Sequence, residues 1–140
     1  MARLSVVIPV YQGASFLRPL HRRLLAVLAG LKQNYEIILV EDGGKDDSWT
    51  VIESICRRDR RVRGIKLSRN FGQHQAIAAG LDHASGDWTV VMDGDLQDLP
   101  EEIPRLVAAT RHGFDIVLAR RAERRHSLLR RAASKLFYSL

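Results

Sequence analysis

The segment VVMDGDLQDLPEEI, residues 90–103, gathers five carboxylates in a chain whose net charge is +6. Asp93 and Asp95 flank a glycine at the end of an apolar run. Residues two apart in an extended chain point to the same side, and Gly94 lets a ligand approach the backbone. With the amide oxygen of Gln97 nearby, these carboxylates predict a site for Mg²⁺ or Mn²⁺ carrying a phosphate. The alternative, a polar strand end with an aspartate turn, accounts less well for a motif that follows an apolar strand.

A second acidic stretch, VEDGGKDDS (residues 40–48), also follows an apolar run, and its composition is typical of a turn. Glu41 or Asp42, at the end of the strand, is expected to accept hydrogen bonds from a nucleotide base. Residues 46–48 are expected to cap the helix that follows.

The stretch SRNFGQHQAIAAG (residues 68–80) predicts a loop followed by a helix of small residues that packs closely on a sheet. Arg69 places a cation in the loop, and Gly72 opens the helix, whose first backbone amides suit an anion. The stretch carries neither a GxGxxG fingerprint nor a P-loop. His74 fits a solvated or packed histidine better than a ligand, and the other histidines lack metal-ligand spacing.

These loops need a scaffold, which the apolar runs supply. Strands are predicted at 4–10, 36–41, 62–67, 88–93 and 114–119. Helices are predicted after Ser15 as the cap, at about 49–58, at 72–84, from Pro100, and from about residue 127. The alternation predicts an α/β fold, a Rossmann-like and mainly parallel sheet flanked by helices, in one domain spanning 1–140. Ligands bind beyond the carboxyl ends of such strands, in the loops 11–15, 42–48, 68–73, 93–99 and 120–126.

Composition narrows the class of protein. With 46% hydrophobic and 27% charged residues, the 140-residue chain is typical of a globular domain. Its apolar runs are far shorter than the ~20 residues of a membrane span, and no signal peptide is evident. The single cysteine, Cys56, excludes an internal disulfide and fits a reducing compartment. A cytoplasmic location is therefore expected.

The basic charge predicts an anionic partner. The pI is about 10.1, and residues 120–140 hold seven bases and one acid. The segment 127–140 has an amphipathic helical pattern with a basic face. Three interpretations stay open: the helix packs on the sheet, lies on an anionic membrane, or holds a phosphate with its arginines. Nucleic acid is not expected, because the chain lacks interleaved aromatics and a recognition-helix motif.

Four motifs together resemble a known family. VVIPVYQG, LVEDGGKDDSW, the segment 68–104 and DIVLARRAER occur in this order. They resemble the family 2 glycosyltransferases, and within these the polyprenyl-phosphate glycosyltransferases such as dolichyl-phosphate mannose synthases and bactoprenol glucosyltransferases. The resemblance runs from about Leu4 to the C-terminus, and segment 68–104 is its most specific part. It implies a GT-A fold that is incomplete on the acceptor side, because the family continues beyond the length of this chain.

The resemblance also implies site residues. Asp93 and Asp95 match the D-x-D metal motif, and Gln97 matches the glutamine of the D-x-D-x-Q form. Arg121, and less closely Arg131, match arginines that hold the donor diphosphate or the acceptor phosphate. The pocket for the nucleotide base and ribose would be lined by Pro9, Tyr11 and Asp42, with Arg69 as a further donor contact.

Two departures from the family pattern bear on the donor contacts. Gln12-Gly13 stands where the family usually has an Asn-Glu or similar pair, and Gly44 stands where serine is common. Both concern details of donor binding and leave the class of enzyme unchanged.

The implied reaction is inverting sugar transfer from a nucleotide diphosphate sugar, of the UDP-glucose or GDP-mannose type, to a polyprenyl phosphate at the cytoplasmic membrane face. The acceptor phosphate, with a second pKa of about 6, is already an anion at neutral pH, so no strong general base is required. The alternatives are a Rossmann-like or receiver-type nucleotide-binding module and a fragment that binds donor without transferring sugar. A homo-oligomer is left open.

Overall fold

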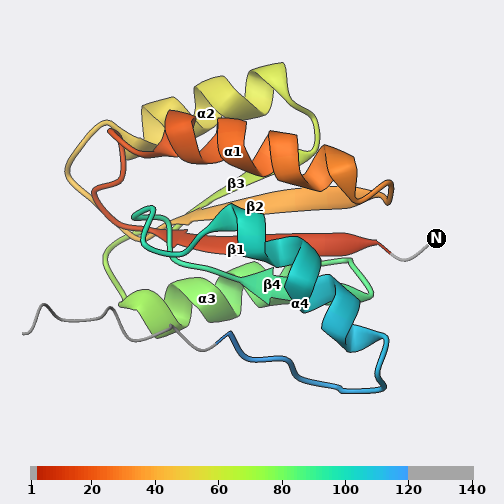
Figure 1. Ribbon diagram of the computed structural model, residues 1–140. Helices are drawn as coiled ribbons and strands as arrows, with labels where there is room; N and C mark the ends of the chain where they lie inside the picture. The colour runs from red at the N-terminus through yellow and green to blue at the C-terminus, as the bar shows by residue number, and fades with distance from the viewer. Residues whose placement is uncertain (1–2, 120–140) are drawn as a thin grey trace, which may run out of the picture.

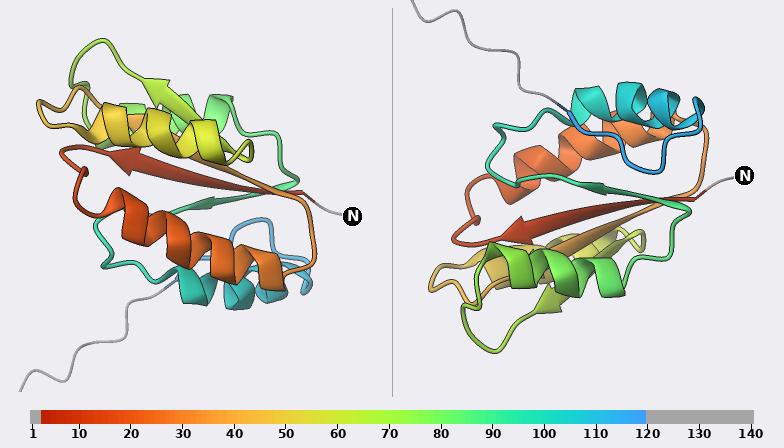
Figure 2. Two further views of the ribbon diagram at one scale, coloured as in Figure 1. Left: turned by 90° about the horizontal axis from the view of Figure 1, so that it is seen from above. Right: turned by 90° about the horizontal axis from the view of Figure 1, so that it is seen from below.

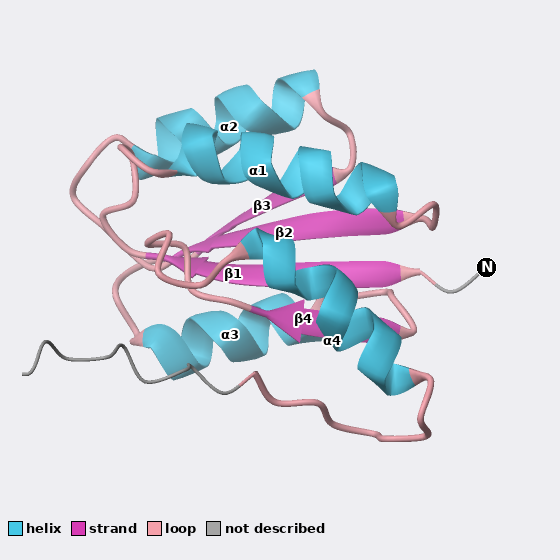
Figure 3. Cartoon of the chain, in the orientation of Figure 1, coloured by secondary structure: helices cyan, strands magenta, loops and turns pink. Residues whose placement is uncertain are grey.

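The computed structural model describes residues 3–119. Its α-helices and β-strands are labelled in Figures 1 and 3. In chain order the elements are β1 (Leu4–Val10), α1 (Leu17–Gly30), β2 (Tyr35–Glu41), α2 (Ser48–Arg58), β3 (Val62–Lys66), α3 (Gln73–Asp82), β4 (Trp88–Val91), the 3₁₀ helix η1 (Pro100–Glu102) and α4 (Ile103–Thr110). Arg121, Arg131 and the helix expected from about residue 127 lie outside the described residues.

The four strands form one parallel sheet in the order β3-β2-β1-β4. In the register of the sheet, Val6 of β1 lies between Ile37 of β2 and Val90 of β4. The predicted α/β architecture with a parallel sheet is therefore confirmed. The chain moves outward from β1 to β2 and β3, and then returns to the other side of β1 for β4. This reversal makes the carboxyl ends of β1 and β4 the expected binding crevice.

Helices cover both faces of the sheet. Figures 1 and 2 show α1 and α2 on one face and α3 on the other, and α4 lies beside α1. Strand residues alternate between the two faces. Val6 and Ile8 belong to the larger core, which α1, α2 and α4 cover, whereas Val7 belongs to the smaller core under α3. No helix among residues 3–119 is long and apolar enough to cross a membrane.

The first helix presents a stripe of four buried leucines to the sheet, as its spacing predicts. The prediction that Ser15 caps this helix is wrong. Phe16 occupies the N-cap position and makes no side-chain capping bond. The carbonyl of Gly13 instead accepts hydrogen bonds from the backbone N–H groups of Phe16 (3.1 Å) and Leu17 (3.2 Å), so the loop itself satisfies the helix start.

Helix α3 packs closely on the sheet, as its small residues predict. Gly80 and Ala76 are buried on the side that faces β1 and β2. A methyl group placed on Gly80 would lie 2.3 Å from Cγ1 of Val7. Glycine is therefore required here because the helix backbone touches a buried strand side chain.

The strand expected at 114–119 is absent, which corrects the prediction. This segment has no regular secondary structure and belongs to none of the four strands. Phe114, Ile116 and Leu118 are 58%, 77% and 86% exposed. An apolar run forms a strand only where a neighbouring strand accepts its backbone hydrogen bonds, and the described residues provide no such neighbour for this segment.

A buried carboxylate lies at the amino-terminal edge of the sheet. Glu36 is 2% exposed. It accepts hydrogen bonds from the hydroxyls of Ser5 (2.7 Å) and Ser85 (2.8 Å) and from the backbone N–H of Ser85 (2.8 Å). Arg3 and Arg63 approach its other oxygen. Burial alone would raise the pKa of Glu36, but these hydrogen bonds and the charge of Arg3 outweigh it and lower the pKa to about 2.

Candidate functional site

The chemically distinctive residues meet at the carboxyl edge of the sheet. Four loops leave the strands there: 11–16 after β1, 42–47 after β2, 67–72 after β3 and 92–99 after β4. Because all four strands are parallel, the loops are adjacent in space although they are distant in sequence. These four loops, which the sequence predicts to form the ligand-binding edge, therefore lie together in the structure.

Asp93 and Asp95 follow β4 on either side of Gly94. The carboxylate of Asp93 accepts a hydrogen bond from the side-chain amide of Gln73 at 2.6 Å, and its backbone N–H donates to Asp98 at 2.9 Å. Asp95 is exposed, and its Oδ1 accepts from the backbone N–H of Gln97 at 3.0 Å. The loop thus places two carboxylates after β4, beside the position where the topology predicts the binding crevice.

The backbone of this loop is tightly constrained. Gly94 is buried, and a methyl group there would lie 3.0 Å from the ring of Phe16 and 3.2 Å from Ile8. Leu96 has a φ of +65°, a left-handed conformation that costs energy for a residue with a side chain. Strain of this kind persists where surrounding contacts over-determine the backbone, as they do at binding sites.

Asp42 fastens the loop after β2 to the loop after β3. It is 3% exposed, and its two oxygens accept the backbone N–H groups of Phe71 (2.8 Å) and Gly72 (2.9 Å). Gly43 has a φ of +66°, and a methyl group there would lie 2.2 Å from the backbone nitrogen of Asn70. The two loops are therefore in direct backbone contact. Sequence reasoning assigned Asp42 to the nucleotide and missed this structural role.

A second set of bonds joins the loops after β1 and β2. Asp46 accepts from the hydroxyl of Ser48 (2.5 Å), from its backbone N–H (3.2 Å) and from the N–H of Ala14 (3.0 Å). The Ser48 hydroxyl in turn accepts from the N–H of Gly13 at 2.7 Å. Burial opposes ionisation of Asp46, but these hydrogen bonds outweigh it and lower its pKa. Of the residues expected to cap α2, Asp46 binds the helix start, whereas Asp47 makes no side-chain capping bond.

Glu41 lies beneath these loops at the end of β2. It is 2% exposed, and its Oε1 accepts a hydrogen bond from the backbone N–H of Gly44. Its Oε2 is buried with no hydrogen-bond partner among the described residues. An unpaired buried oxygen is costly, and such groups concentrate at functional sites. This feature supports the prediction that one of the acids at the end of β2 contributes to binding.

The remaining predicted donor contacts surround the same edge. Pro9 is partly buried within β1, and Tyr11, the next residue but one, is 51% exposed. Arg69 is exposed, and its guanidinium lies 4.1 Å from the centre of the Phe71 ring. Gln97 is exposed on the loop of Asp95. All four therefore lie at or beside the loops of the carboxyl edge.

The carboxylate ligands at this edge suit a divalent cation that is bound together with a phosphate. Among residues 3–119, no group of three His, Cys, Asp or Glu side chains is placed to hold a metal ion. The pair Asp93 and Asp95 supplies hard oxygen ligands without a closed protein cage. That arrangement suits Mg²⁺ or Mn²⁺, which keep several waters and bind through one or two carboxylates together with substrate phosphates. The residues present therefore fit the predicted ion.

We expect Asp42→Asn to loosen the loop that precedes α3. One oxygen would become an NH₂ group facing a backbone N–H, so the free energy of unfolding should fall by about 1–3 kcal/mol. Hydrogen exchange measured by NMR should show lost protection at Phe71 and Gly72 while the amides of β1 remain protected. Asp47→Asn removes an exposed carboxylate from the same loop and should change stability by about 0.5 kcal/mol or less. Unchanged exchange at both amides would contradict the role assigned to Asp42.

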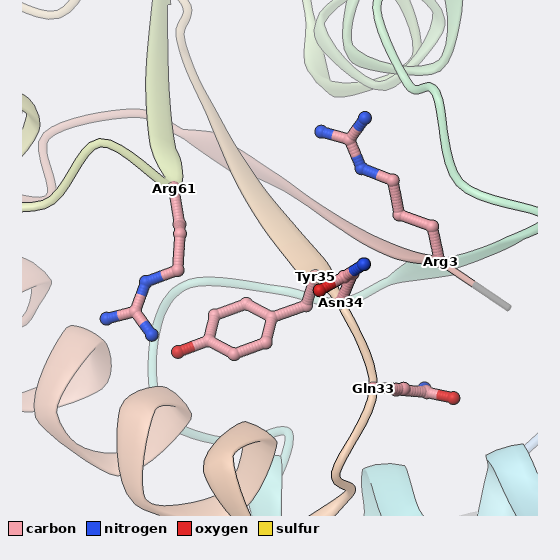
Figure 4. Close-up of a pocket in the computed structure, with 5 residues that line it drawn as sticks. All are labelled: Arg3, Gln33, Asn34, Tyr35 and Arg61. Atoms are coloured by element: carbon pink, nitrogen blue, oxygen red, sulfur yellow. The ribbon is translucent and has the colours of Figure 1, made fainter. Parts of the chain in front are cut away.

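A hollow of about 440 Å³ lies at the opposite edge of the sheet, lined by Arg3, Gln33, Asn34, Tyr35 and Arg61. Figure 4 shows the Arg61 side chain beside the Tyr35 ring, and its guanidinium lies 4.8 Å from the ring centre. Arg61 already binds Asp59 through two nitrogens (2.8 and 3.1 Å), and Arg3 binds Glu36. These guanidiniums are engaged in holding buried carboxylates, so the candidate site is placed at the carboxyl edge.

Known proteins resemble this chain over nearly all of its length. Undecaprenyl-phosphate 4-deoxy-4-formamido-L-arabinose transferase from Proteus mirabilis is 45% identical over 139 residues, which are 99% of this chain and 43% of the relative. The protein of the same name from Shewanella sediminis is 45% identical over 138 residues, with 98% and 42% covered. The chain thus spans less than half the length of these relatives.

Solved structures share the fold at low sequence identity. Glucosyl-3-phosphoglycerate synthase from Mycobacterium tuberculosis, in complex with Mn²⁺, UDP and phosphoglyceric acid, superimposes with a TM-score of 0.61 at 24% identity, covering 78% of this chain and 39% of that one. TarS 1–349 from S. aureus gives a TM-score of 0.60 at 22% identity, covering 79% and 32%. These likenesses confirm the GT-A-type fold.

The family assignment rests on the sequence as a whole. The family model described as "Glycosyl transferase family 2" matches residues 5–138, which is nearly the entire chain. The motifs that carry the resemblance lie within that match, and Asp93 and Asp95 follow β4 at the carboxyl edge of the sheet. The chain therefore belongs to the family 2 glycosyltransferases.

Proposed function

We propose that this chain is the donor-binding part of a transferase that moves a sugar, with inversion, from a nucleotide diphosphate sugar to a polyprenyl phosphate. One observation carries the proposal: the paired carboxylates Asp93 and Asp95 stand at the β1/β4 crevice of a chain that is 45% identical to undecaprenyl-phosphate sugar transferases over 99% of its length. The relatives' names support the proposed acceptor class, and the position of the two carboxylates supports the proposed place of the donor.

Different residues are proposed to have different roles in donor binding. Asp93 and Asp95 would hold Mg²⁺ or Mn²⁺, which stabilises charge developing on the leaving diphosphate. Asp42 would contribute indirectly, because it accepts the backbone N–H of Phe71 and so holds the loop that carries Arg69. Arg121 and Arg131 are the proposed partners of the diphosphate or of the acceptor phosphate, since guanidinium groups bind phosphates through two parallel hydrogen bonds.

The base and ribose of the donor are proposed to lie over the loop after β1. Tyr11 and Pro9 offer apolar surface there, and Tyr11 is half-exposed. Of the two acids at the end of β2, Glu41 is the one proposed to accept hydrogen bonds from the base, because its Oε2 has no partner among the described residues whereas both oxygens of Asp42 bind backbone N–H groups. Sequence and fold are compatible with both UDP-linked and GDP-linked sugars.

The membrane is the proposed place of action, because a polyprenyl phosphate is anchored in it. Residues 3–119 carry fifteen bases and fifteen acids, so the net charge of +6 belongs to residues 120–140. Clustered lysines and arginines attract the anionic cytoplasmic leaflet by about 1 kcal/mol each. We infer peripheral attachment at the cytoplasmic face through this basic segment.

A second candidate is a chain that binds donor without transferring sugar. The observation that favours it is coverage, since the chain spans 43% of the Proteus mirabilis relative. Both candidates require the same donor site, so binding tests the site and a transfer assay with polyprenyl phosphate separates the two.

The donor site is tested by calorimetric titration of UDP-glucose and GDP-mannose, each with and without Mn²⁺. We expect Mn²⁺-dependent binding of one donor, weakened at least about tenfold in Asp95→Ala, which corresponds to about 1.4 kcal/mol. Asp82→Ala is the matched control, because it removes an exposed carboxylate at the end of α3 distant from the crevice. A folded wild type that binds neither donor would contradict the proposed function.

A further inference from the structure

Gln73 connects the start of α3 to the acidic loop after β4. It is the first residue of α3, and its Nε2 donates to Oδ1 of Asp93 at 2.6 Å. The two residues are twenty positions apart, so the bond joins two separate loops of the carboxyl edge. The sequence analysis did not identify Gln73 as a site residue.

The backbone that carries Gln73 is itself fixed. The carboxylate of Asp42 accepts the N–H groups of Phe71 and Gly72, the two residues that precede Gln73. Gly72 has a φ of +98°, and its carbonyl accepts the N–H of Ala76 at 3.1 Å. These hydrogen bonds, joined by the backbone between Gly72 and Gln73, therefore connect the end of β2 to the carboxylate after β4.

The chemistry of an amide suits this position. A neutral N–H donor fixes the rotamer of a carboxylate without cancelling its negative charge, whereas a lysine would neutralise that charge. Partners that orient a metal-binding side chain in this way typically change metal affinity by 10–100-fold when they are removed. An aliphatic side chain of similar size would fill the same space and offer no donor.

We propose that Gln73 is a positioning residue for Asp93, holding its carboxylate in the orientation that binds the cation of the donor complex. This inference rests on the proposed function, because it assumes that Asp93 binds that cation. Through Asp42, the same amide links the metal side of the crevice to the end of β2, where Glu41, the acid proposed to contact the nucleotide base, lies.

The test compares Gln73→Leu with Gln75→Leu in the 140-residue chain. Gln75 is exposed in the same first turn of α3, so its variant matches the change in size and polarity. Binding of UDP and of GDP is titrated in Mn²⁺ and in EDTA, and the Mn²⁺ affinity of the nucleotide complex is measured by electron paramagnetic resonance. Thermal unfolding monitored by circular dichroism confirms that each variant is folded.

We expect Gln73→Leu to weaken Mn²⁺-dependent binding about 10-fold or more. Nucleotide binding in EDTA and the unfolding temperature should match those of Gln75→Leu, which a general loosening of α3 would not allow. If the wild type binds with Mn²⁺ and Gln73→Leu binds equally well, the positioning role is overturned and the donor site stands. If the wild type shows no Mn²⁺-dependent binding, the donor site and this inference are both overturned.

Discussion

Glu36→Gln is expected to lower the free energy of unfolding by about 3 kcal/mol at neutral pH. The ionised carboxylate is buried and receives three hydrogen bonds from Ser5 and Ser85 as well as the charge of Arg3. A neutral amide loses the ion pair and turns an NH₂ group toward donors, and breaking such a buried network typically costs 3–5 kcal/mol. Urea denaturation at pH 7 measures the loss.

The stability that Glu36 contributes is also expected to depend on pH. The pKa of Glu36 is lowered from an ordinary 4.5 to about 2, so its contribution is complete above pH 4.5 and is lost as the pH falls toward 2. The shift corresponds to about 3 kcal/mol, of which about 2 kcal/mol should be gone at pH 3. The stability difference between wild type and Glu36→Gln should therefore narrow by about 2 kcal/mol between pH 6 and pH 3.

Glu53→Gln supplies the control for the same chemical change at the surface. Glu53 is 46% exposed and forms an i,i+4 pair with Arg57 at 3.7 Å, so its loss should cost less than about 0.5 kcal/mol. A stability difference for Glu36→Gln that stays constant with pH would show that the carboxylate is not held ionised by its partners.

Gly80→Ala is expected to destabilise the chain by about 1–3 kcal/mol, although alanine is the better helix former. Helix propensity alone would favour the substitution by about 1 kcal/mol. The added methyl group would lie 2.3 Å from Val7, which is fully buried in β1, so α3 would have to move away from the sheet. Chemical denaturation reports the balance of these two effects.

Two further variants test the cause. Gly30→Ala changes an exposed glycine at the end of α1 that has open space around it, and it should be neutral or stabilising. Val7→Ala removes the atom that Gly80→Ala would strike, so the double variant should be at least about 0.5 kcal/mol more stable than the sum of the single effects predicts. Additive effects would show that α3 does not rest on Val7.

The strands of the sheet could be predicted because each is an apolar run that is followed by residues typical of a turn. LSVVIPV and EIILVE lie at the two central positions, where both faces are buried, and such strands are continuously apolar. FDIVLA has a comparable pattern, yet it forms no strand among the described residues. Apolarity indicates that a segment prefers to be buried and does not supply the neighbouring strand that a sheet requires.

The candidate site could be predicted only in outline. Acids placed directly after strands indicated which loops meet, and Asp93 and Asp95 lie where that argument puts them. The roles of Asp42 and Gln73 depend on bonds between loops separated by twenty residues or more, and spacing along the chain does not encode such distances. Glu36 was missed because a glutamate at the start of a predicted strand (36–41) is expected to be exposed, and the sequence does not show that Ser85 and Arg3 surround it.

The buried network around Glu36 and the loop clamp of Asp42 occupy opposite ends of one strand. The two residues are six positions apart, or about 20 Å along an extended chain, which is well beyond the roughly 7–10 Å within which substitutions usually couple. Charges so far apart influence each other weakly, and substitutions at such distances usually have additive effects. The acid tolerance that Glu36 confers and the loop contacts that Asp42 makes at the proposed donor site can therefore be altered separately, by selection or by protein engineering.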